Sequence, residues 1–209
     1  MEKTTIVLAT KNPKKAEEIQ RMVPNNIQIN CLSELPEAEG ISQAEETGET
    51  FRENALIKAK YWAKKLRPKI PNVRVLAEDS GLEIEALNGY PGVLTHRCVK
   101  ELCPEANINE DKPEQLYPLL LKLMEESGNP SKDAKWVSAM AYVDSEKQLS
   151  DEQCVVGLMT QCEGEKAFGF DQYFSVNNKT LAQMTYEEKD MIGPRRKALM
   201  DVLSKAGLI

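Results

Sequence analysis

The segment Val73–Leu76 is largely apolar and leads directly into Ala77-Glu78-Asp79-Ser80-Gly81. An apolar run of this length predicts a buried strand. The polar residues behind it, followed by a glycine that frees the backbone, predict chemistry at the edge of a rigid sheet. Two adjacent carboxylates repel each other unless a cation or a proton lies between them, so the segment indicates a metal or general-base site. The alternative is that Glu78 and Asp79 are solvated turn residues.

The chain has 209 residues, which is enough for one large domain or two small lobes around a shared core. Apolar residues make up 41% and charged residues 29%, as in an ordinary globular protein. No apolar run approaches the roughly 20 residues that span a bilayer, and the N-terminus lacks the pattern of a signal peptide. The net charge of −6 argues against a nucleic-acid polymer as partner. Five cysteines, an odd number at wide spacings, predict reduced thiols and a cytoplasmic location.

Helical and strand patterns alternate in the first half of the chain, which predicts an α/β fold with a mixed sheet. Helix-start signals occur at Asn12-Pro13 and at the capping boxes that begin at Thr50 and Thr185. The break at Gly193-Pro194 predicts a new, final helix. We expect strands at 6–9, 27–31, 73–77, 136–143 and 153–160, helices at 13–23, 50–66 and 113–127, and a loop at 33–49.

Lysines crowd the first of these helix starts, in Thr10-Lys11-Asn12-Pro13-Lys14-Lys15. Cations are unfavourable at the positive end of a helix, but a bound anion would reverse this, because free N–H and ammonium groups together form a phosphate site. The alternative is that the lysines simply extend into solvent.

A second lysine, Lys58, shares one helical face with Phe51, Ala55 and Trp62, and Asn54 lies one turn before it. A lysine on an apolar face is costly unless it is paired or binds a ligand, although its ammonium group could also reach the surface. The acids Glu46, Glu78 and Asp79 supply the oxygen ligands that suit Mg²⁺. Glu46 lies in an acidic loop and could equally be solvated.

An aromatic pair around a glycine precedes a carboxylate in Phe168-Gly169-Phe170-Asp171. Such a group could stack on a nucleobase and accept hydrogen bonds from its ring nitrogens. The alternative is a strand that enters the core.

The order of these motifs resembles that of the Ham1/inosine triphosphate pyrophosphatase family over nearly the whole chain. In this chain, Thr10-x-Asn12-x-x-Lys15 is similar to the family's N-terminal phosphate loop. The segment from Glu46 to Ala59 follows the family's second motif. The family's third motif is matched in this chain by Glu78–Leu82, together with Pro91-Gly92-Val93 and Arg97. Two further motifs resemble Phe168–Asp171 and the stretch from Lys179 to Lys189.

The resemblance implies a long, curved mixed sheet with flanking helices and two lobes around a central cleft, within a single domain at 1–209 that is often a homodimer. It implies hydrolysis of deaminated purine nucleoside triphosphates (ITP, dITP, XTP) to monophosphate and pyrophosphate, with Mg²⁺ as cofactor. Glu46 and Asp79 would hold the metal, and the candidate catalytic residues are Asp79, Lys15 and Lys58. Substrate contacts would come from Thr10, Asn12, Lys15, Asn54, Lys58, Ser80, Phe168, Asp171, Lys189 and Arg195.

Three departures from the family pattern fall on the base-recognition side. Gly193-Pro194 stands before Arg195 where the family usually has Ser-His, Gln172-Tyr173 replaces a proline-containing motif, and the approach to Phe168 has fewer glycines. Two alternatives therefore stay open: a Maf-like pyrophosphatase that acts on other bases, and a nucleotide-binding protein without turnover.

Overall fold

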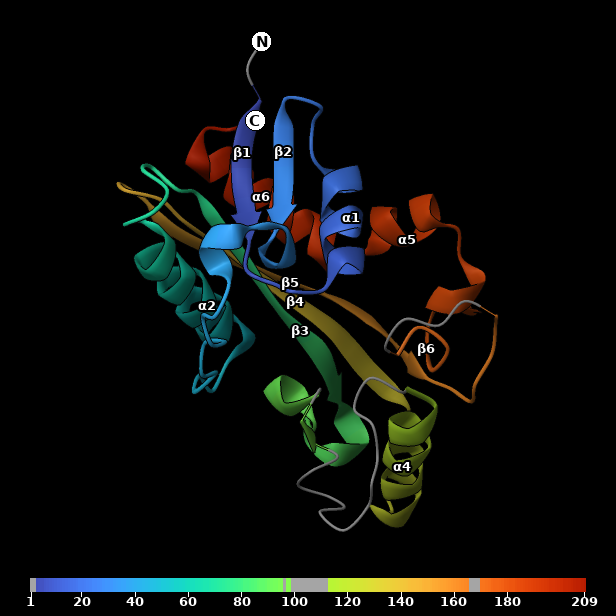
Figure 1. The fold of residues 1–209 in the computed structure, drawn as a ribbon. Coiled ribbons are helices and arrows are strands. Elements are labelled where there is room, and N and C mark those ends of the chain that lie inside the picture. The colour runs from blue at the N-terminus through green and yellow to red at the C-terminus, as the bar shows by residue number, and fades with distance from the viewer. Residues whose placement is uncertain (1–2, 96, 99–112, 166–169) are drawn as a thin grey trace. The chain divides into compact units, whose positions relative to one another are not determined.

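A computed structural model describes residues 3–95, 97–98, 113–165 and 170–209, and Figure 1 shows its fold. Seven strands form an open sheet in the order β2-β1-β3-β4-β5-β6-β7. The pairs β1/β2 and β1/β3 are parallel, whereas β5/β6 and β6/β7 are antiparallel. The predicted α/β class with a mixed sheet and flanking helices is confirmed.

The strands and helices follow the predicted order closely. The strands are β1 (Thr4–Leu8), β2 (Ile27–Cys31), β3 (Val75–Ile84), β4 (Asp133–Val143), β5 (Gln148–Met159), β6 (Phe174–Val176) and β7 (Lys179–Thr180). The helices are α1 (Pro13–Met22), α2 (Phe51–Leu66), α4 (Pro113–Glu126), α5 (Tyr186–Ile192) and α6 (Pro194–Ala206). The predicted loop at 33–49 contains two short 3-10 turns, Leu32–Glu34 and Pro36–Ala38, and is otherwise irregular.

The chain divides into two compact units, and three strands contribute residues to both. Unit 1 comprises residues 1–79, 138–153 and 195–209, and unit 2 comprises residues 80–137 and 154–194. The arrangement of one domain with two lobes around a cleft stays a prediction.

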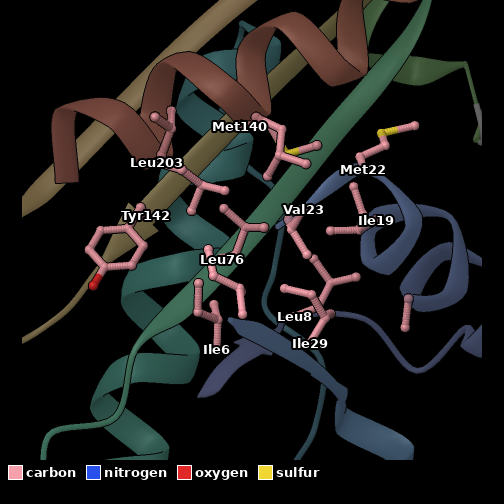
Figure 2. Packing of buried hydrophobic residues seen from close by; sticks show 14 of the residues in the cluster. Ile6, Leu8, Ile19, Met22, Val23, Ile29, Leu76, Met140, Tyr142 and Leu203 are labelled. Carbon is pink, nitrogen blue, oxygen red and sulfur yellow. The ribbon is translucent and has the colours of Figure 1, made fainter. Parts of the chain in front are cut away.

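The core of unit 1 lies between helices and strands that are far apart in sequence. Ile19 of α1 and Leu203 of α6 pack with Ile6, Leu8 and Leu76 of the strands, as Figure 2 shows. All five side chains are at most 2% exposed. Burial of this apolar surface, at about 25 cal/mol per Å², fixes α1 and α6 against β1 and β3.

Unit 2 has its own core, in which α4 packs its Tyr117, Leu120 and Met124 with Leu82 and Trp136. The aromatic rings of this core meet edge to face: Phe170 lies 6.2 Å from Tyr117 and 5.8 Å from Trp136 between ring centroids.

The helix starts depend on the side chains that the sequence predicts, with one difference. Asn12 accepts a hydrogen bond from Lys14 N, and Thr185 and Glu188 form a complete capping box. Thr50 accepts from Glu53 N, but the Glu53 carboxylate bonds Glu49 N instead of closing the box. The box predicted at Thr50 is therefore half formed, because Glu53 stabilises the preceding loop.

The predicted end of the third strand is wrong. β3 continues from Val75 to Ile84, so Glu78, Asp79 and Gly81 lie within the strand and not behind it. Gly81 serves close packing here: a Cβ at this position would overlap Thr95 Oγ1, which accepts a hydrogen bond of 3.0 Å from Leu82 N.

Within the described ranges, none of the helices is both long and apolar enough to cross a membrane.

Candidate active site

The phosphate-loop candidates lie where β1 passes into α1. Thr10 Oγ1 accepts a hydrogen bond of 3.1 Å from Asn12 N, and Asn12 Oδ1 accepts one of 3.0 Å from Lys14 N. Pro13 occupies the first helical position, where its missing N–H costs nothing. These bonds fix the backbone at the positive end of α1, the usual environment for an anion.

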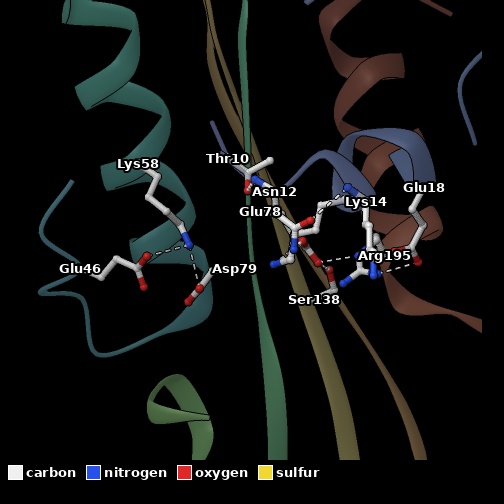
Figure 3. A network of polar contacts seen from close by, with 11 residues as sticks. Thr10, Asn12, Lys14, Glu18, Glu46, Lys58, Glu78, Asp79, Ser138 and Arg195 are labelled. Carbon is white, nitrogen blue, oxygen red and sulfur yellow. Dashed lines mark hydrogen bonds and ion pairs between the residues drawn. The ribbon is translucent and has the colours of Figure 1, made fainter. Parts of the chain in front are cut away.

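Lys58 of α2 holds two of the predicted acids together. Its ammonium group lies 2.9 Å from Asp79 Oδ1 and 3.2 Å from Glu46 Oε1. Figure 3 shows Glu46, from the loop before α2, and Asp79, from β3, both directed at Lys58 Nζ. Only 13% of the lysine side chain is exposed, so its ammonium group is engaged in ion pairs and not solvated.

Burial and charge act against each other in this pair. Burial lowers the pKa of Lys58, but Asp79 and Glu46 raise it by more, so the pKa ends above its ordinary value. Burial raises the pKa of Asp79, and the neighbouring ammonium lowers it by less. Lys58 therefore stays charged at neutral pH, and Asp79 is a stronger base than an ordinary aspartate.

Asn54, on the same helix, is fully buried and ties the acidic loop to α2. Its Oδ1 accepts a hydrogen bond of 2.8 Å from Gly48 N, two residues after Glu46. The Asn54 side chain also lowers the pKa of Asp79. Neither Asn54 Nδ2 nor Asp79 Oδ2 has a hydrogen-bond partner among the described residues. Buried polar atoms of this kind usually face a ligand or water.

Glu78 and Asp79 do not share a cation, contrary to the sequence interpretation. Successive side chains of a strand point to opposite faces, and in Figure 3 Glu78 points away from Lys58. Glu78 Oε1 lies 2.6 Å from Arg195 Nε, and its Oε2 lies 3.4 Å from Lys15 Nζ. The predicted pair of neighbouring acids thus serves two separate groups.

Arg195 belongs to this second group and is almost completely buried. Its Nη1 lies 2.7 Å from Glu18 Oε1 of α1, and Ser138 Oγ lies 3.3 Å from the Glu78 carboxylate. Burial lowers the pKa of Arg195, while Glu78 and Glu18 raise it by more, so the guanidinium group stays charged. The structure places Arg195 in unit 1 with these carboxylates, and its contact with a base stays a prediction.

Two other residues that the sequence predicts to contact the base, Lys189 and Asp171, form an ion pair in unit 2. Lys189 Nζ of α5 donates to Asp171 Oδ1 at 2.9 Å and to Oδ2 at 2.8 Å. Both side chains are nearly buried. Phe168 lies outside the described residues, while its neighbour Phe170 lies in a turn and not in the strand considered as an alternative.

The remaining predicted contact, Ser80, is a buried residue of β3. Sequence reasoning missed Glu18, Ser138 and the contact of Trp136 with Lys189. The spacing of Lys15 and Glu18, one helical turn apart, offered a local signal for Glu18 alone.

Nearly the whole chain also matches known proteins in sequence and in fold. The model of the Ham1 family matches residues 6–205. The chain belongs to the Ham1 family. A dITP/XTP pyrophosphatase of Elusimicrobium minutum is 36% identical over 206 residues, covering 96% of this chain and 98% of the relative. A dITP/XTP pyrophosphatase of Thermoanaerobacter sp. is 37% identical over 199 residues, covering 93% and 92%.

A solved structure of a Ham1 protein from Coxiella burnetii matches with a TM-score of 0.80 at 27% identity, covering 99% of this chain and 100% of that one. The Ham1 match thus extends over sequence and fold, and it favours a triphosphate pyrophosphatase over the Maf-like alternative.

Proposed function

We propose that this protein hydrolyses deaminated purine nucleoside triphosphates, ITP, dITP and XTP, to the monophosphate and pyrophosphate. The observation that carries the proposal is the Lys58 ammonium group held between Glu46 and Asp79 beside the unpartnered Asp79 Oδ2. The full-length similarity to dITP/XTP pyrophosphatases supports the substrate class. Retention of both acids and of Lys58 argues against a protein that only binds nucleotides.

On the phosphate side, the chain supplies cations and backbone donors in unit 1. Lys15 and Lys58 neutralise the triphosphate, while Thr10, Asn12 and the start of α1 orient it. Asp79, made more basic by burial, orients the attacking water and accepts its proton as the phosphorus–oxygen bond breaks. Asn54 maintains the loop that carries Glu46.

The same acids fit a magnesium ion. Mg²⁺ takes one or two carboxylates and completes its shell with water and phosphate oxygens, so Glu46 and Asp79 suffice. The buried Asp79 Oδ2 is a free ligand atom for it. The described residues contain no cluster of three or more His, Cys, Asp or Glu side chains suited to a metal. When bound, Mg²⁺ would neutralise charge on the phosphate oxygens.

On the base side, Lys189 and Asp171 offer one donor and one acceptor at adjacent positions in unit 2. A 6-oxopurine such as hypoxanthine presents the complementary set, an acceptor at O6 and a donor at N1. Adenine presents the opposite set, a donor at N6 and an acceptor at N1. The Lys189–Asp171 pair therefore favours inosine over adenosine triphosphates, with Phe168 as the proposed stacking residue.

The substitution of Gly193-Pro194 for Ser-His keeps the fold, because α6 begins at Pro194 as predicted. It removes side chains that could hydrogen-bond a base oxygen. We therefore expect either weaker discrimination between inosine and adenosine triphosphates than the family pattern implies or a shifted preference, with Arg195 and Lys189 retaining part of the discrimination.

The test is pyrophosphate release from dITP, XTP, dATP and dGTP, with Mg²⁺ and in excess EDTA. We expect preference for deaminated purines, dependence on a divalent cation, and a loss of about 10²-fold or more in Asp79→Asn, which keeps the shape of the side chain but not its charge. Nucleotide binding by Asp79→Asn should largely survive. Near wild-type turnover in Asp79→Asn, or undiminished turnover in EDTA, would remove Asp79 or the metal from the mechanism.

We also propose that the protein works as a homodimer in the cytoplasm on free nucleotides, without a nucleic-acid polymer or membrane as partner. Light scattering coupled to size-exclusion chromatography tests the dimer: a monomer at micromolar concentration would contradict it.

A further inference from the structure

Trp136 of β4 contacts the Lys189–Asp171 pair in the core of unit 2. Lys189 Nζ lies 5.7 Å from the centroid of the indole ring while it donates to both oxygens of Asp171. Trp136 is 2% exposed, and only 12% of the lysine side chain is exposed. A cation over an aromatic face is attracted by the ring quadrupole, and the attraction is strongest where both groups are desolvated.

Gly193, at the end of α5, gives the indole its space. Its N–H donates to Lys189 O at 2.8 Å, so the glycine is tied to the residue that carries the ammonium group. A Cβ on Gly193 would lie 3.2 Å from Trp136 Cη2, tighter than most Cβ contacts, and 2.8 Å from Lys189 O. Any side chain at this position would press on the indole and on the backbone of Lys189.

The indole also restricts a flexible side chain. Lysine has four rotatable bonds and loses much conformational freedom when its head group is held in one place. The Phe170 ring packs edge to face against Trp136, with 5.8 Å between centroids, so the indole is itself fixed. The aromatic surface thus holds the ammonium group at the position from which it donates hydrogen bonds to Asp171.

We propose that Trp136 is a specificity-determining positioning residue, whose indole, accommodated by Gly193, holds the Lys189 ammonium group against Asp171. This inference rests on the proposed reading of 6-oxopurines by Lys189 and Asp171. A displaced ammonium group would deprive O6 of its donor and would no longer repel the amino group of adenine. Trp136 therefore acts on the choice of base and not on the hydrolytic step.

The experiment measures kcat/KM for ITP and ATP in the full-length protein with Trp136→Leu and Trp136→Phe. Trp136→Leu should lower the ITP/ATP ratio about tenfold, the size expected when a desolvated cation–π contact is lost. Trp136→Phe keeps an aromatic face and should retain most of the ratio. The matched control is Trp62→Phe, which changes a fully buried tryptophan of α2 in unit 1 and should leave the ratio unchanged.

A second arm does not depend on the stability of Trp136→Leu. Gly193→Ala, which adds a Cβ but no hydrogen-bonding group that could read the base, should lower the ITP/ATP ratio. Combination with Trp136→Phe should recover the part of the loss that comes from the indole, because phenylalanine lacks the outer indole atoms, whereas the close approach to Lys189 O remains. A ratio within twofold of wild type, either in Gly193→Ala or in a folded Trp136→Leu variant, would overturn the positioning role.

Lys189→Met separates this inference from the function it rests on. If Lys189→Met leaves the ITP/ATP ratio unchanged, the proposed base reading itself fails. If Lys189→Met collapses the ratio while Trp136→Leu does not, base reading stands and only the role of Trp136 is wrong.

Discussion

At the scale of single residues, Lys58 occupies the space between the two carboxylates that a magnesium ion would use. Its ammonium group forms ion pairs with one oxygen of Asp79 and one oxygen of Glu46. A buried charge that loses its partner costs several kcal/mol, so the buried Asp79 depends on a nearby cation more than Glu46 does, whose side chain is 30% exposed. Lysine and metal would therefore compete for the same two carboxylates, and substrate binding would draw the ammonium group towards phosphate.

Replacing Lys58 by methionine tests this competition. Methionine suits the apolar face of α2, but Glu46 and Asp79 lose their shared cation, so the melting temperature should fall in the absence of metal. Added Mg²⁺ should raise that melting temperature more than in wild type, and KM for ITP should rise by about tenfold or more, as expected for the loss of a charge-assisted contact. Thermal scans with and without Mg²⁺, together with steady-state kinetics, provide the measurement.

The matched control is Lys60→Met, which changes an exposed lysine two residues along the same helix and should alter neither quantity. An equal Mg²⁺ response in wild type and Lys58→Met would show that lysine and metal do not compete.

At the scale of secondary-structure elements, the turn between β4 and β5 is built around one carboxylate. Asp144 accepts hydrogen bonds from Glu146 N, Lys147 N and Tyr142 Oη at 2.6–2.9 Å. Burial raises the pKa of Asp144, but these donors together lower it by more, so the pKa lies below its ordinary value. The ionised side chain therefore stabilises the folded hairpin turn.

This turn predicts a pH-dependent stability difference. Because the folded pKa of Asp144 is below the unfolded value of about 3.9, its contribution is fully present above that value and is lost as the pH falls through the folded pKa. Asp144→Asn should be about 1 kcal/mol less stable than wild type at pH 7, and the difference should shrink at pH 3. Urea unfolding at both pH values measures it.

Glu146→Gln serves as the control, since it neutralises an exposed acid of the same turn without touching these bonds. A difference between wild type and Asp144→Asn that stays constant from pH 7 to pH 3 would exclude the charge as its source.

The elements themselves were largely predictable, and the reason is local. Asn12, Thr50 and Thr185 signal helix starts through bonds to residues two or three positions ahead, and all three do cap helices. The end of β3 was not predictable in this way. Glu78 and Asp79 look like the end of a strand, and only their partners elsewhere in the chain, Arg195 and Lys58, make it possible to bury them within one.

At the scale of the whole molecule, Arg195 joins segments of unit 1 that are distant in sequence. It links the start of α6 to Glu18 of α1 and Glu78 of β3, over separations of 177 and 117 residues. No local pattern could have predicted these pairs, since only the folded chain brings them together.

Neutralising Arg195 alone should destabilise the protein strongly. Arg195→Met leaves Glu18 and Glu78 without their common cation, and loss of one partner from a buried ion pair costs about 3–5 kcal/mol. The triple variant Glu18→Gln/Glu78→Gln/Arg195→Met removes the guanidinium group and both of its carboxylates, leaving only the partly exposed Lys15, and should recover much of this loss. The measurement is the unfolding free energy from urea titrations of the three proteins.

If Arg195→Met unfolds at the same urea concentration as wild type, the network is not a stabilising one. If the stable triple variant also loses discrimination between ITP and ATP, the predicted contact of Arg195 with the base is supported.

The alternation of Glu78 and Asp79 in β3 also limits how this gene can vary in length. Insertion or deletion of one residue between Val75 and Glu78 would turn every later side chain of the strand to the other face. Glu78 would then lie on the face of Lys58 and Asp79 on the face of Arg195, so both ion pairs would be lost. A change of two residues would keep the faces and shift only the position along the strand. In β3 an odd length change therefore exchanges the faces of Glu78 and Asp79, whereas an even one keeps the faces but moves each carboxylate about 7 Å along the strand, out of reach of its partner.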